Sequence, residues 1–212
     1  YHDRFKGYIK NITGALNIES NNIEIGTYNN SATGLRSIAI GANTTASNTD
    51  AIAMGENTTA TGISSTAIGK ATNASADGAT SMGNGTTASG VNSTSMGVNT
   101  LASGSHSTAT GNGTVASGTN SISAGSSTTA GGNQSFAVGF SSTANGNVAT
   151  AMGNSTVASG TSATAMGLYS VASGVAATAT GYDTEASGAN STAMGKETTA
   201  SGENSFATGQ GP

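Results

Sequence analysis

Few residues in this chain carry groups that could perform chemistry. The two histidines, His2 and His106, are far apart in the sequence, so they do not form a candidate catalytic pair. The chain has no cysteine, which excludes disulfides, thiolate metal sites and cysteine nucleophiles. It contains no Gly-x-Ser-x-Gly elbow, phosphate-binding loop or His-Glu-x-x-His motif. We therefore expect no catalytic site, no metal site and no cofactor.

The carboxylates are scattered rather than grouped. Asp50, Asp77, Asp183 and Glu185 each lack a carboxylate partner at a matching position, so no acid and base pair for glycoside hydrolysis is available. The regularly spaced aspartates of calcium-binding solenoids are also missing. We interpret these four side chains as solvated surface charges.

Composition limits the class of protein further. Only 8% of the residues are charged and there is a single proline, which does not fit a disordered chain. Four of the six basic residues lie in the first 36 positions, and the remainder does not form a nucleic-acid footprint. No apolar run approaches the roughly 18 residues of a membrane helix. The first residues lack the apolar region of a signal peptide, and we expect the chain to be part of a longer protein.

A repeat of 14 residues organises most of the sequence. It is marked by a glycine that closes a pentapeptide such as SIAIG, and it runs through thirteen copies without a slip. These repeat glycines are Gly41, Gly55, Gly69, Gly83, Gly97, Gly111, Gly125, Gly139, Gly153, Gly167, Gly181, Gly195 and Gly209. Alanine stands five residues after each of the first twelve. A degenerate copy, one residue too long, precedes them at 23–34 and marks the start of the array.

Fourteen residues are too few for two helices but suit two short strands and two tight turns, given the frequent glycine and threonine. Each repeat is therefore predicted to form one coil of a β-solenoid. Stacked coils would pair strand over strand at about 4.8 Å. Thirteen of them would make a rod roughly 60 Å long.

Strand alternation assigns the faces of each coil. The residues two and four before the glycine are always alanine or serine, as at Ala39 and Ala193. Those three and five after it are serine or threonine and then alanine. We expect these small residues to meet inside a thin coil.

Large apolar residues at the positions one and three before the glycine are then predicted to form an outward stripe along the rod. Left in water, such a stripe would forfeit many kcal/mol at about 25 cal/mol per Å², so we expect further copies of the chain to cover it. The opposite interpretation places methionine and isoleucine inside the coil and alanine outside. The predicted stripe residues are Ile38, Ile40, Ile52, Met54, Ile68, Met82, Met96, Phe136, Val138, Met152, Met166, Met194 and Phe206.

The motif S-x-A-[IM]-G-x-x-[ST]-x-A-[ST]-G, as in STAIGKATNASADG (65–78) and STAMGKETTASGEN (191–204), resembles the head repeat of YadA-like trimeric autotransporter adhesins. The resemblance covers about 37–209. It implies an all-β, left-handed parallel β-roll solenoid of 14-residue coils, assembled as a homotrimer. It also implies display on a Gram-negative outer membrane through a stalk and a C-terminal anchor, neither of which is in this sequence.

The resemblance divides the chain into two parts. Residues 27–212 are predicted to form the β-roll, and residues 1–26 an N-terminal cap that covers the open strand edges of its first coil. The cap carries Arg4, Lys6 and Lys10, for which a binding role is the alternative interpretation.

The function implied by the resemblance is that of a non-enzymatic adhesin head, which binds a host cell-surface or extracellular-matrix protein. Collagen, fibronectin, laminin and receptors of the CEACAM type are all bound within the family, and shared repeats do not choose among them. The alternative is an ice-binding β-solenoid, favoured by Thr-x-Thr spacing at 108–110 and 178–180 but interrupted by methionine in six coils.

A candidate receptor site lies where the chain breaks its polar outer face. Several large residues stand one, two or four positions after a repeat glycine, and they are concentrated late in the array. Stacking of the coils should bring them into one patch. Scattered tolerated substitutions, or extra contacts between neighbouring chains, are the alternative interpretations. The predicted receptor-binding residues are Phe140, Val157, Leu168, Tyr169, Val171 and Tyr182.

Overall fold

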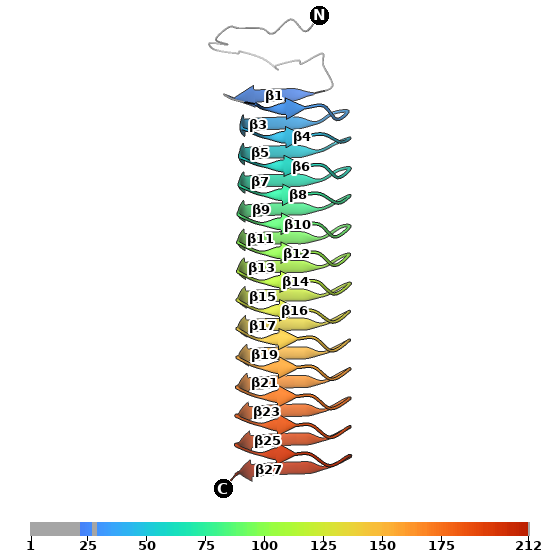
Figure 1. The fold of residues 1–212 in the computed structure, drawn as a ribbon, viewed down its shortest axis with the longest axis vertical. Coiled ribbons are helices and arrows are strands. Elements are labelled where there is room, and N and C mark those ends of the chain that lie inside the picture. The colour runs from blue at the N-terminus through green and yellow to red at the C-terminus, as the bar shows by residue number, and fades with distance from the viewer. Residues whose placement is uncertain (1–21, 27–28, 212) are drawn as a thin grey trace, which may run out of the picture.

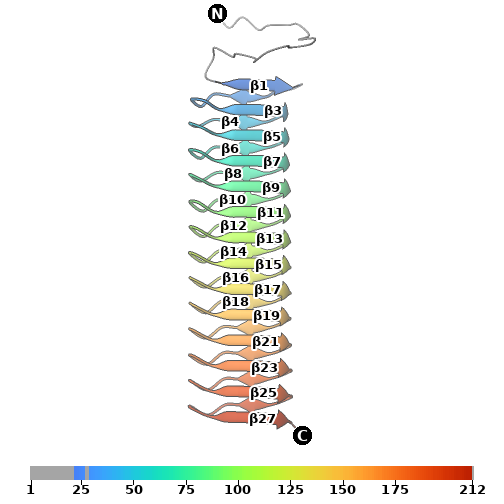
Figure 2. The same ribbon diagram turned by 180° about the vertical axis from the view of Figure 1, so that it is seen from behind.

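The protein is a straight stack of coils, shown from two sides in Figures 1 and 2. The structure, a computed structural model, describes residues 22–26 and 29–211. Residues 1–21 of the predicted cap, which include Arg4, Lys6 and Lys10, therefore lie outside the described residues. Each coil contains one long and one short strand, which run in opposite directions across the rod (Figure 1). The prediction of an all-β parallel solenoid with 14-residue coils is confirmed.

The long strands form one parallel sheet of 14 strands, which we call the long-strand sheet. Its members are β1 (Ile23–Gly26), β3 (Ile38–Ala42), β5 (Ile52–Glu56), β7 (Thr66–Lys70), β9 (Thr80–Asn84), β11 (Thr94–Val98), β13 (Thr108–Asn112), β15 (Ile122–Ser126), β17 (Phe136–Phe140), β19 (Thr150–Asn154), β21 (Thr164–Leu168), β23 (Thr178–Tyr182), β25 (Thr192–Lys196) and β27 (Phe206–Gln210).

The short strands form a second parallel sheet of 13 strands, the short-strand sheet. Its members are β2 (Ser31–Ala32), β4 (Thr45–Ala46), β6 (Thr59–Ala60), β8 (Asn73–Ala74), β10 (Thr87–Ala88), β12 (Leu101–Ala102), β14 (Val115–Ala116), β16 (Thr129–Ala130), β18 (Thr143–Ala144), β20 (Val157–Ala158), β22 (Val171–Ala172), β24 (Glu185–Ala186) and β26 (Thr199–Ala200).

The core between the two sheets consists of alanine, serine and threonine. Ser37 and Ala39 point inward from the long-strand side and Thr44 and Ala46 from the short-strand side, and all four are fully buried. Threonine is the largest fully buried side chain. The two sheets therefore approach too closely for larger residues, and the interpretation that placed methionine and isoleucine inside the coil is wrong.

Two turns complete each coil and form the two long edges of the rod. The first turn joins a long strand to the short strand that follows, and the second turn leads into the next long strand. Both turns place one residue in the left-handed region, such as Asn57 (φ 55°) in the first turn and Asp50 (φ 58°) in the second. The Asn57 N–H donates to Ala42 O (2.9 Å) and the Asp50 N–H to Leu35 O (2.9 Å), so each turn is bonded to the preceding coil. The turns are thereby held in register along the rod.

The first coil contains one extra residue, as the sequence predicts. Gly26 pairs with Gly41, fifteen positions later, whereas Ser31 pairs with Thr45 at the usual spacing of fourteen. The insertion therefore lies in the first turn of that coil. There the Asn30 side chain donates to Gly41 O (2.8 Å) and accepts from the Thr44 hydroxyl (2.8 Å).

The start of the solenoid differs from the predicted boundary at residue 27. Strand β1 pairs in register with β3, so residues 23–26 belong to the long-strand sheet and not to the segment before it. Its sequence IEIG carries the same alternation as the later copies, and this alternation places the strand in the stack.

Candidate binding surfaces

The outer face of the long-strand sheet carries the predicted apolar stripe. All thirteen predicted residues lie on this face, and none is buried within the chain. Met152 and Met166 pair directly and are 39% and 38% exposed, while Phe206 reaches 67%. A second copy or another partner is the physical means of removing this surface from water.

The apolar stripe has a gap near its middle. Thr108 and Thr110 occupy β13, and Ala124 replaces a large residue in β15, where Ile122 remains 42% exposed. On either side the large residues resume with Met96 in β11 and with Phe136 and Val138 in β17. The large apolar residues therefore follow one face of the rod but are interrupted near its middle.

Five of the six predicted receptor-binding residues lie at two places on the rod. Tyr169 and Tyr182 touch at the first-turn edge, with ring centroids 6.3 Å apart and planes at 80°. Leu168 pairs with Tyr182 at the ends of β21 and β23. Val157 and Val171 pair with each other on the outer face of the short-strand sheet.

Phe140 is set apart from the other predicted receptor residues. It ends β17 and is 54% exposed, but Asn154 stands between it and Leu168 in the sheet. Position in the strand is shared, however, because Phe140, Leu168 and Tyr182 are each the last residue of a long strand.

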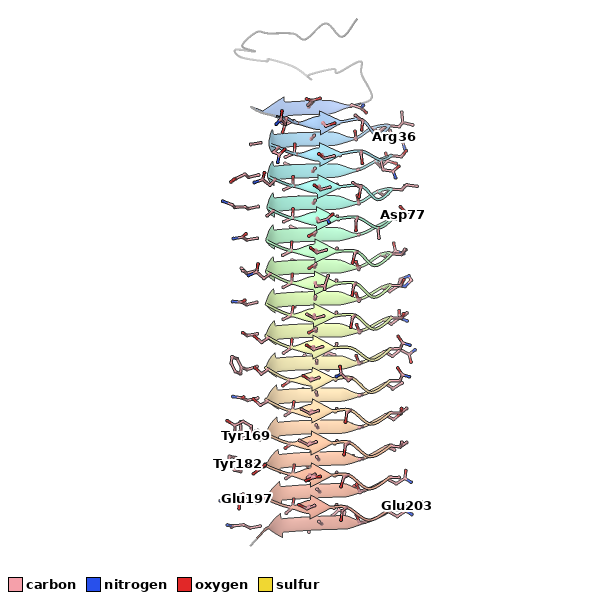
Figure 3. All side chains as sticks on the ribbon, viewed as in Figure 1. Arg36, Asp77, Tyr169, Tyr182, Glu197 and Glu203 are labelled. Atoms are coloured by element: carbon pink, nitrogen blue, oxygen red, sulfur yellow. The ribbon has the colours of Figure 1, made fainter. Side chains whose placement is uncertain are left out.

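Sequence reasoning missed the charged neighbours of the tyrosine pair. Lys196 pairs with Tyr182 in the sheet and places its Nζ 5.9 Å from the centre of that ring. The same Nζ lies 3.3 Å from Glu197 Oε1. Matching positions one coil apart could have revealed this cluster, because Lys196 and Glu197 lie one repeat after Tyr182 and Asp183. In Figure 3 Tyr169, Tyr182 and Glu197 project from one edge of the rod, and Asp77 and Glu203 project from the other.

Two other carboxylates, those of Asp50 and Asp77, bond to a neighbouring coil. Asp50 accepts from Nε and Nη2 of Arg36, one coil earlier, at 2.6 Å each. These hydrogen bonds lower the pKa of Asp50; desolvation opposes the shift, and the charge of the guanidinium adds to it. Asp77 Oδ1 accepts from the N–H of Ile63 (2.8 Å) across the second-turn edge. Both side chains therefore have structural partners in the neighbouring coil.

The described residues also lack two features that would point to other functions. Over 22–26 and 29–211 there is no group of three or more histidine, aspartate or glutamate side chains positioned to hold a metal ion. Within the same ranges, no helix has the length and apolar character needed to cross a bilayer. The Nε2 atom of His106 lies 3.4 Å from the side-chain nitrogen of Asn92.

Taken together, the stacked 14-residue coils, the alanine core and the outward apolar residues define a parallel β-solenoid with an exposed apolar face. The family model of the YadA head domain repeat, which spans two copies, matches residues 32–58, 60–86, 88–114, 116–142, 134–156, 144–170 and 186–211. The chain belongs to the YadA head family. A comparison with individual curated proteins gave no match.

Membership of this family bears on the two functional interpretations. YadA heads are surface-exposed adhesin domains of the bacterial outer membrane, which assemble as trimers in general. An adhesin-like function is therefore indicated, whereas the ice-binding interpretation has no support.

Proposed function

We propose that this chain is the head of a trimeric autotransporter adhesin, which binds a host cell-surface or extracellular-matrix protein without enzymatic activity. The proposal places the head on the exposed surface of a Gram-negative outer membrane. Its main support is the family match along the rod, together with an outer face of the long-strand sheet that carries large apolar residues in most of its strands.

The exposed apolar face supports a trimer. Two rods packed face to face would leave part of each apolar edge in water, whereas three rods can close around a common axis. The long-strand sheets would then face the axis, with Met152 and Met166 of each chain among the contacts. The turn edges and the short-strand sheet would remain available to a receptor.

The receptor is proposed to dock over the late coils, through a patch formed by Leu168, Tyr169 and Tyr182 with Val157 and Val171, and with Phe140 as an outlying contact. Support comes from the exposure of the two tyrosines, 50% and 43%, and from the disproportionate share of binding energy that aromatic anchors contribute at interfaces. Their contact gives the patch a fixed centre.

A binding screen tests this proposal. The purified protein is measured against immobilised collagen, fibronectin, laminin and CEACAM-type ectodomains, and saturable binding to at least one is expected. A variant with Leu168, Tyr169 and Tyr182 replaced by serine should lose that binding while its melting curve is retained. Full affinity in the variant would place the receptor site elsewhere on the head, and the absence of any binding would contradict the adhesin function.

A further inference from the structure

Charged side chains are concentrated beside the tyrosine pair. Between Asp77 and Asp183 the sequence contains no aspartate, glutamate, lysine or arginine. Charge then resumes with Asp183, Glu185 and the pair Lys196 and Glu197, all within two coils. The charge therefore returns at the coils that carry Tyr182.

The backbone fixes these groups in two columns along the first-turn edge. Leu168, Tyr182 and Lys196 occupy equivalent positions in consecutive long strands. The residue that follows each of these has a positive φ: 60° at Tyr169, 52° at Asp183 and 54° at Glu197. The Asp183 N–H donates to Leu168 O (2.8 Å) and the Glu197 N–H to Tyr182 O (2.8 Å). Side chains in both columns therefore recur at about the 4.8 Å coil spacing.

A third carboxylate, that of Glu185, lies on the outer face of the short-strand sheet. Glu185 stands directly after Val171 in the register of β22 and β24, and its side chain is exposed. The cluster thus holds three carboxylates, Asp183, Glu185 and Glu197, against the single ammonium of Lys196. Its net charge is negative, whereas the earlier pair at this edge, Glu56 and Lys70 (3.4 Å), is balanced.

Tyr182 already has a cation near its ring. The Lys196 ammonium lies 5.9 Å from the ring centroid, within the range of a cation–π contact, and is also held by Glu197 at 3.3 Å. The side chain of Lys196 is about half exposed (51%), so it can be displaced into water. At such a site one cation can contact the Tyr182 ring and the Glu197 carboxylate at the same time.

We infer that the cluster of Tyr169, Tyr182, Asp183, Glu185 and Glu197 binds arginine side chains of a basic protein segment, with a guanidinium replacing the Lys196 ammonium at Tyr182. The inference rests on the proposed function, because it names the chemistry of the partner at the same patch. A guanidinium fits better than an ammonium because it stacks on a tyrosine ring and also donates two parallel hydrogen bonds to a carboxylate. Lys196 is then an internal competitor of the partner.

The test uses a fluorescein-labelled ten-residue peptide of alternating arginine and serine, titrated with the full chain and followed by fluorescence anisotropy. Tyr182→Leu should weaken binding about fivefold through loss of the cation–π contact. Glu197→Gln should weaken it about threefold. Lys196→Met should strengthen it about threefold, because the competing ammonium is removed.

Glu203→Gln is the matched control, since it removes the same charge from the opposite edge of the rod (Figure 3). Its affinity should equal that of the unmodified chain, and the corresponding lysine peptide should bind more weakly than the arginine peptide. Melting curves check that each variant is folded.

Several results would overturn the inference. Equal losses for Glu197→Gln and Glu203→Gln would reduce the binding to general electrostatic attraction. Unchanged binding by Tyr182→Leu would remove the role of the ring. Weaker peptide binding by Lys196→Met, or heparin binding that depends on Lys196, would indicate an anionic partner instead. Any of these results with receptor binding intact in the host-protein screen would refute the arginine chemistry alone and leave the adhesin function standing.

Discussion

Buried hydroxyl groups account for much of the variation between coils. Where serine replaces alanine two residues before the repeat glycine, its hydroxyl bonds to the threonine of the same coil, as in Ser95 Oγ to Thr100 Oγ1 (2.7 Å). The same pairing joins Ser81 with Thr86 (2.7 Å). Where alanine is kept, the threonine hydroxyl either bonds to a neighbouring coil, as Thr156 Oγ1 does to Ser142 Oγ (2.9 Å), or has no partner, as at Thr72. A buried polar group without a partner costs stability, so the serine substitutions are compensated changes.

This difference gives a pair of opposite predictions at the residue scale. Thr72→Val removes an unpartnered hydroxyl at nearly constant shape and should raise the free energy of unfolding by about 1 kcal/mol. Thr100→Val leaves the Ser95 hydroxyl without its partner and should lower that free energy by about 1 kcal/mol. Urea unfolding of both variants measures the effect, and shifts of the same sign would show that the hydroxyl pairing is not its cause.

Single residues were predictable from the sequence where the strand period of two applied to them. Ala39 and Met152 lie on the faces that the alternation predicts. The two left-handed turn positions could not be inferred from residue type, because they hold residues as different as Asn57 and Tyr169 in the first turn and Val148 in the second. Hydrogen bonds to the preceding coil hold that conformation, and they are a property of the stack.

At the scale of the element, the repeat glycine allows each long strand to reach its last residue. Gly153 has φ +132°, a region that side chains rarely adopt, and a Cβ there would overlap the carbonyl oxygen of Gly167. The neighbouring coils therefore approach backbone to backbone at this point. Because the strand continues through the glycine, the residue after it ends the strand, which periodicity alone did not reveal.

Gly153→Ala is therefore expected to be severely destabilising. Both the unfavourable φ and the overlap with Gly167 must be relieved, at a cost of about 3 kcal/mol or more. Gly113→Ala is the matched control, because Gly113 also has positive φ (+62°) but its Cβ would meet only Ser127 Oγ at 3.8 Å. The control should lose only about 1 kcal/mol. Comparable losses in the two proteins would contradict a role for the close backbone approach.

At the scale of the whole molecule, each coil contacts only its neighbours. Long strands pair only with adjacent long strands, and short strands only with adjacent short strands. Stability should therefore be close to a sum over coils and their interfaces. The sequence predicted this architecture well because a strict period repeats the same local solution. The missed tyrosine and lysine contact depends on which residues happen to meet across two coils.

Removal of one whole coil should therefore preserve the fold. Deletion of residues 112–125 joins Gly111 to Ser126 and keeps every later residue in register, so cooperative melting should persist close to the original temperature. Deletion of residues 112–118 is the control, because it would place a long strand where a short strand belongs. That protein should melt at a much lower temperature. Circular dichroism during heating compares the two, and similar melting of both would contradict the register argument.

The last prediction concerns the assembly that covers the apolar stripe. Met152 and Met166 pair on the outer face of the long-strand sheet and are 39% and 38% exposed in the single chain. The proposed trimer would bury them at its axis, so replacing both by aspartate would bury carboxylates without partners and should dissociate or unfold it. The control replaces Thr129 and Thr143 by aspartate. These residues pair at outward positions of the short-strand sheet, so the trimer should remain. Light scattering should give three times the chain mass for the unmodified protein and the control, and a lower mass or a lower melting temperature for the methionine variant. A monomeric unmodified protein at micromolar concentration, or a methionine variant with unchanged mass and melting, would refute association through this face.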